Sequence, residues 1–156
     1  MGNDPRPKLT DEYIVQLPQS SKGKTYASSE LHIIDSTTFL VLARDGNGFG
    51  DTDSKSSYKQ ADLMSIKGAT NIANTQYDSA NPITPVAPGG ALVASVTPAQ
   101  YKSFVSFIDA DQLAKFGLHN GGAFDQNLIA GKLESLAVVP AGIAGASNDY
   151  FLVTVR

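Results

Sequence analysis

The stretch Phe39-Leu-Val-Leu-Ala-Arg44 returns near the end of the sequence as Phe151-Leu-Val-Thr-Val-Arg156, with Phe, Leu, Val and Arg in the same places. Each copy follows a short apolar stretch that carries a glutamate, Glu30 or Glu134. Apolar and β-branched runs of this length are typical of strands that are buried on both faces. A glutamate strand followed by an apolar strand, occurring twice, indicates a repeated β unit of the kind found in propellers.

Strand-like segments alternate with turn-rich segments along the rest of the chain. We therefore expect a mainly β fold, a partial β-propeller of about two four-stranded blades with a short helical insertion. The predicted strands of the first blade are residues 13–17, 25–34, 37–44, 58–66 and 69–73. The predicted organisation is an extended lead-in at 1–10, a first blade at 11–73, a helical insertion or atypical blade at 74–130, and a truncated further blade at 131–156.

Two helical segments are expected within the insertion. Thr97 and Pro98 have the residue types of a helix N-cap and first turn, and the following aromatic residues suggest a buried helical face. A second short helical turn is expected at 111–116, where Gly117 would end it.

Composition excludes several classes of function. The net charge is −3 and the 12 Lys and Arg residues are scattered, so capture of nucleic acid is not expected. We find no apolar run long enough to span a membrane, and residues 1–6 lack the apolar core of a signal peptide. The absence of cysteine rules out disulfides, thiolate zinc sites and cysteine nucleophiles.

The two glutamates are the main candidates for chemistry. A glutamate in an apolar strand is costly unless it meets a cation, a hydrogen-bond donor or a water-filled channel. Glu30 and Glu134, at equivalent positions of the repeat, would face one propeller channel, where carboxylates could bind calcium. Arg44 or Lys132 could hold an anionic group nearby. The alternative is that each glutamate pairs with an arginine of the neighbouring blade and holds the blades together.

The segment from Asp45 to Asp53 has the density of oxygen ligands of a calcium loop. An EF-hand would need a glutamate at its twelfth position, which is Ser56. The alternative is a solvated turn whose Asp and Asn residues supply positive-φ geometry and local caps. Of the two histidines, His32 is the better candidate for chemistry because it neighbours Glu30, and His119 is expected to be structural.

Three segments carry a resemblance to a known family. Residues 27–46, which include Ser29-Glu30 and Arg44-Asp45, residues 58–63 and residues 132–137 resemble motifs of the phytase-like β-propeller family. Ala43 replaces an acid of the family pattern, and Ser135 replaces a glycine. The resemblance covers residues 11–72 and 131–156 and implies the C-terminal portion of such a protein.

The resemblance implies a calcium-assisted hydrolase that acts on phosphate esters or related esters, as a secreted or extracytoplasmic protein. It implies a small anionic ester as substrate, and either the missing N-terminal blades or self-association as partners. A non-catalytic propeller binding or scaffold module is the alternative. The candidates are Glu30, Glu134 and His32 for catalysis, Arg44, Lys59 and Lys132 for substrate binding, and Glu30, Glu134 and Asp45 for metal binding.

Overall fold

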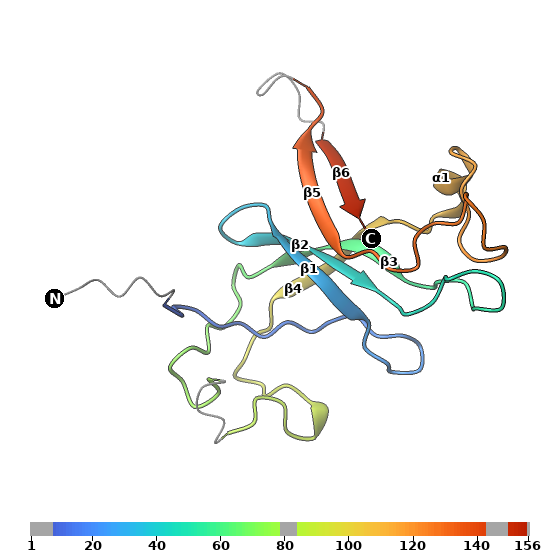
Figure 1. Cartoon of the computed structure of the whole chain (residues 1–156). Helices are drawn as coiled ribbons and strands as arrows, with labels where there is room; N and C mark the ends of the chain where they lie inside the picture. Colours follow the sequence, from blue (N-terminus) through green and yellow to red (C-terminus); the bar gives the residue numbers. More distant parts are fainter. Residues whose placement is uncertain (1–7, 79–83, 143–149, 156) are drawn as a thin grey trace. The chain divides into compact units, whose positions relative to one another are not determined.

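The computed structural model describes residues 8–78, 84–142 and 150–155, which belong to two compact units. One unit comprises residues 1–16 and 66–100, and the other comprises residues 17–65 and 101–156. The regular elements are β1 (Ala27–Ile33), β2 (Thr38–Arg44), β3 (Lys59–Ser65), the short 3-10 turn η1 (Pro88–Gly90), β4 (Gln100–Ser106), α1 (Ala110–Ala114), β5 (Ser135–Pro140) and β6 (Tyr150–Val155), as labelled in Figure 1.

The larger unit is built on a four-stranded antiparallel sheet with the strand order β1-β2-β3-β4. The central strand β2 pairs with β1 and β3, so that Leu42 lies opposite Glu30 on one side and Ala61 on the other. Leu42 and Ala61 are fully buried and belong to one core cluster with Leu133 and Leu136, which come from the region of β5. The prediction of a mainly β fold is therefore confirmed. The sheet is open, and the propeller stays a prediction.

The two copies of the repeated sequence both form the second strand of an antiparallel pair. β2 pairs with β1, and β6 pairs with β5 in a separate two-stranded sheet. The registers differ by two residues. Phe39 lies opposite Ile33, three residues beyond Glu30, whereas Phe151 lies opposite Val139, five residues beyond Glu134. Glu134 therefore precedes β5, whereas Glu30 lies within β1. Arg156 lies outside the described residues.

The predicted helix that begins at Thr97 is wrong, because residues 100–106 form the strand β4. Its side chains include Tyr101, Phe104 and Val105, which favour strands, and pairing with β3 outweighs the local helix-start signal. The predicted helical turn is confirmed as α1. Asp109 caps it by accepting a hydrogen bond from the Gln112 N–H. Among the described residues, no helix is long and apolar enough to cross a membrane.

The other unit has little regular structure in its described part. The segments predicted as strands at 13–17 and 69–73 are irregular. Individual backbone hydrogen bonds join them to their neighbours: Ile72 N–H donates to the Glu12 carbonyl at 2.8 Å, and Ala99 N–H donates to the Ile14 carbonyl at 2.8 Å. Ile72 is almost fully buried and anchors this unit.

Candidate functional site

Four of the predicted charged residues, Glu30, Arg44, Lys132 and Glu134, lie close to the start of β5. Arg44, at the end of β2, donates from Nη2 to Glu134 Oε1 at 3.0 Å and from Nε to Ser29 Oγ at 3.2 Å. Its third bond runs from Nη1 to the Asp45 carbonyl at 3.3 Å. The Arg44 side chain is only 12% exposed, whereas that of Glu134 is 45% exposed. Each of the three guanidinium nitrogens therefore donates a hydrogen bond to a protein oxygen.

Glu30 joins the same two parts of the chain by a different bond. The backbone N–H of Leu136 in β5 donates to Glu30 Oε2 at 3.1 Å. Lys132 contributes a weaker contact, with its Nζ 3.9 Å from Glu134 Oε1 and its side chain 61% exposed. We call Ser29, Glu30, Arg44, Lys132 and Glu134 the junction cluster. It contains two carboxylates and two cations, so its formal charges cancel.

Local backbone geometry places this cluster. The register between β1 and β2 shifts between Ser28 and Glu30, and a bulge of this kind redirects the side chains at a strand edge. Beyond the bulge, Glu30 lies opposite the buried Leu42. Leu42 and Leu136 belong to the same core cluster, so apolar packing joins β2 to β5. The bond from Leu136 to Glu30 lies next to this packing.

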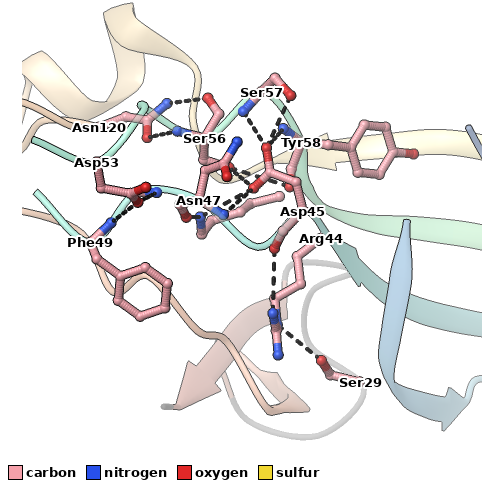
Figure 2. Close-up of polar contacts among 12 residues, drawn as sticks. Ser29, Arg44, Asp45, Asn47, Phe49, Asp53, Ser56, Ser57, Tyr58 and Asn120 are labelled. Atoms are coloured by element: carbon pink, nitrogen blue, oxygen red, sulfur yellow. Dashed lines mark hydrogen bonds and ion pairs between the residues drawn. The ribbon is translucent and has the colours of Figure 1, made fainter. Parts of the chain in front are cut away.

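Residues 45–58 form a loop, here called the Asp45 loop, that is organised around the Asp45 carboxylate (Figure 2). Oδ1 accepts from Ser56 Oγ at 2.7 Å, and Oδ2 accepts from the Ser57 N–H at 2.6 Å and from the Tyr58 N–H at 3.2 Å. Burial raises the pKa of Asp45, but the hydrogen bonds from Ser56 and Ser57 outweigh it and hold the pKa below its ordinary value. Asp45 is thus an anion fixed by hydrogen-bond donors of its own loop.

Lys59 lies directly beneath this loop. Its side chain is fully buried, and Nζ donates to the Asn47 carbonyl at 2.7 Å and lies 3.7 Å from Asp45 Oδ1. Burial lowers the pKa of Lys59, and the nearby Asp45 carboxylate opposes that shift. The predicted contact of Lys59 with an anionic substrate has no support in this geometry, because the whole side chain lies in the interior.

The remaining polar groups of the loop serve as caps. Asp53 Oδ2 accepts from the N–H groups of Gly48 and Phe49 at 2.7 and 2.9 Å. Gly48 has φ 95°, where a side chain would be strained, and its Cβ would lie 3.0 Å from the Lys59 ammonium. Asn120, far along the chain, bonds both the N–H and the carbonyl of Ser56. These contacts match the capped turn of the alternative prediction: Gly48, Gly50 and Ser56 are buried, and half of the loop residues are exposed.

The predicted calcium ligands are engaged by hydrogen-bond donors of the protein itself, and calcium binding stays a prediction. A calcium ion needs six to eight oxygen ligands, whereas the carboxylates of Glu30, Asp45 and Glu134 accept hydrogen bonds from Leu136, the Asp45 loop and Arg44. The Lys59 ammonium already supplies a cation beside Asp45. Within residues 8–78, 84–142 and 150–155, no three His, Asp or Glu side chains form a group that could hold a metal ion.

The two histidines lie in different surroundings. His32 lines a cavity of about 620 Å³ whose other walls are apolar, among them Leu40, Phe104 and Leu152. His119 bonds Asp125 Oδ1 through Nε2 at 3.0 Å and the Gly121 carbonyl through Nδ1 at 2.7 Å. These two bonds raise the pKa of His119 above its ordinary value. The expectation that His119 is structural fits these contacts.

A buried carboxyl group escaped the sequence analysis. Asp62, on β3, is fully buried, and its Oδ2 accepts from the hydroxyls of Tyr58 and Tyr101 at 2.7 and 2.9 Å. Burial raises the pKa of Asp62, and the two hydroxyl bonds offset this shift only in part. The Tyr58 ring also stacks on Tyr26 at a centroid distance of 4.2 Å. The sequence shows Tyr58 four residues before Asp62, but it does not indicate that Tyr101 also bonds Asp62.

Comparison with known proteins finds a longer relative. No family model matches the sequence, and no solved structure matches it. An uncharacterized secreted protein of Arthroderma benhamiae is 34% identical over 163 residues. The alignment covers 95% of this chain and 32% of the relative, so the chain spans about a third of the length of that protein.

Proposed function

We propose that this chain is a non-catalytic β scaffold module of a larger extracellular protein, in which the junction cluster fastens neighbouring sheets. The observation that carries the proposal is the ion pair of Arg44 with Glu134, at 3.0 Å, beside the bond from Leu136 to Glu30. The ion pair joins β2 to the residue that directly precedes β5, and the second bond joins β1 to β5 itself. The size and extracellular location are supported by the longer relative, which is named a secreted protein.

In this proposal the four-stranded sheet is one blade of a phytase-like β-propeller, and β5 with β6 begins the next. Two observations support it. Strands that are consecutive in the sequence are neighbours in the sheet, as in a propeller blade, and both sequence repeats end in the second strand of an antiparallel pair. Further blades of the longer protein, or copies of this chain, would cover the remaining sheet surfaces.

A second candidate is hydrolysis of small anionic esters by the intact protein, which is the activity that the resemblance implies. The observation that favours it is the position of Lys132, which is 61% exposed beside the half-exposed carboxylate of Glu134. An exposed ammonium can bind a phosphate or a carboxylate, and a neighbouring carboxylate can accept a proton from water. Arg44 would take part only after it releases Glu134.

A double-mutant cycle on Arg44→Met and Glu134→Gln tests the scaffold role. We expect a coupling energy of about 1 kcal/mol in the free energy of unfolding, because Arg44 is buried while Glu134 stays partly hydrated. The matched control pairs Glu134→Gln with Lys132→Met, where both groups are exposed and the coupling should be less than about 0.5 kcal/mol. Denaturant unfolding measures both cycles.

The same variants separate the two candidates. Zero coupling between Arg44 and Glu134 would contradict the scaffold role. Hydrolysis of p-nitrophenyl phosphate or p-nitrophenyl acetate that is lost in both Glu134→Gln and Lys132→Met, at unchanged stability, would favour the hydrolase instead.

A further inference from the structure

A second concave site lies beside the junction cluster and shares Lys132 with it. A cavity of about 550 Å³, within the size range of small-molecule sites, is formed between the Asp45 loop and the loop of residues 124–132. Gly48 and Phe49 line one side of the cavity, and residues 124–126 and 128–132 line the rest.

Close packing fixes both walls of this cavity. A Cβ on Gly131 would lie 2.7 Å from the Phe49 ring, so the ring rests directly on the glycine. A Cβ on Gly50 would lie 2.8 Å from Leu128. The Phe124 N–H donates to Asp51 Oδ1 at 3.0 Å, which ties one loop to the other. The cavity is therefore formed before a ligand arrives, which reduces the entropy lost on binding.

Two aromatic rings are exposed at this cavity. Phe49 is 49% exposed and Phe124 is 74% exposed, although both are among the largest apolar side chains. Figure 2 shows the Phe49 ring turned away from the polar groups around Asp45. Exposed rings at the edge of a preformed cavity offer flat apolar surfaces to a ligand.

The polar groups of the cavity define the ligand further. Asp125 supplies an acceptor, Lys132 supplies a donor, and the exposed Gln126 amide supplies both. His119 and the Asn127 N–H hold the Asp125 carboxylate in place at 3.0 and 2.8 Å. One negative and one positive charge cancel, so the lining favours a neutral ligand over a strongly charged one.

We propose that this cavity binds a neutral carbohydrate. A pyranose ring combines an apolar face of C–H groups, which can stack on the rings of Phe49 and Phe124, with hydroxyls that both donate and accept. Those hydroxyls match the carboxylate, amide and ammonium groups of Asp125, Gln126 and Lys132. This binding goes beyond the scaffold role and uses neither Glu30 nor the Arg44 ion pair.

Calorimetric titration of the full chain with neutral hexasaccharides of glucose, mannose and N-acetylglucosamine tests the proposal. We expect at least one of them to bind, and Phe124→Ala to weaken that binding about tenfold or more. Gln126→Ala should also weaken it. The matched control is Phe116→Ala, because Phe116 is 77% exposed but lies outside the cavity lining. This variant should bind the sugar with the affinity of the unmodified chain.

Three results would overturn the proposal: no binding of any of the three sugars, binding that Phe124→Ala leaves unchanged, or tighter binding of an acidic oligosaccharide such as oligogalacturonate. Because Phe124 is exposed, the variant should keep its fold, which circular dichroism checks. A negative sugar result would leave the coupling of Arg44 with Glu134 unaffected, so failure here is distinguishable from failure of the scaffold role.

Discussion

Replacement of Lys59 by Met should lower the free energy of unfolding by about 3–5 kcal/mol, the range found when one partner of a buried ion pair is removed. The fully buried ammonium satisfies the Asn47 carbonyl and faces the Asp45 carboxylate. Methionine fills the space of the alkyl chain but leaves both oxygens without that donor. Denaturant unfolding followed by circular dichroism measures the loss.

The control for this substitution is Lys102→Met, because Lys102 is an exposed lysine in the neighbouring strand β4. Its effect should stay within about 0.5 kcal/mol, as for ordinary surface positions. A Lys59→Met variant as stable as the control would mean that the ammonium does not organise the Asp45 loop.

Leu42→Ala should destabilise the chain by about 2–5 kcal/mol, the range for large-to-small substitutions in a core. Leu42 is fully buried in the central strand β2 and belongs to the core cluster that includes Leu133 and Leu136. The cavity left by truncation would thus weaken the four-stranded sheet and its packing against the segment around β5. Thermal and denaturant unfolding both report the change.

Leu31→Ala is the matched control, since Leu31 is 51% exposed on β1. The same loss of side-chain atoms should cost less than about 0.5 kcal/mol there. Equal effects at Leu42 and Leu31 would contradict the placement of the core on the face of β2 that carries Leu42.

The strands and the helical turn that depend on short-range residue patterns could be predicted from the sequence. The apolar run at 37–44 predicted β2, because uninterrupted β-branched and apolar residues favour a buried strand. The glutamate stretch at 25–34, which ends at the Asp35-Ser36 turn, predicted β1. The turn at 111–116 was predicted from its glycine stop. The strand β4 was missed because its pairing with β3 joins segments distant in the sequence, which no local pattern records.

Part of the candidate site could be predicted in the same way. The repeat picked out Glu30, Arg44 and Glu134, which the structure brings into one junction. The sequence could not decide between a metal site and an ion pair, because that choice depends on which donors surround each carboxylate. The burial of Lys59 and the bonding of Asp62 by two tyrosines depend on tertiary packing, so the composition of their strands gave no sign of either.

The central claim is that the junction cluster holds the β5–β6 sheet in a fixed place against the four-stranded sheet. The chain contains no cysteine, so spin labels at Leu31→Cys in β1 and Ala137→Cys in β5 would be the only labels present. Pulsed electron paramagnetic resonance should then give one narrow distribution of distances, which broadens when Arg44→Met and Glu30→Gln are added. A distribution that is already broad without those two substitutions would contradict the claim.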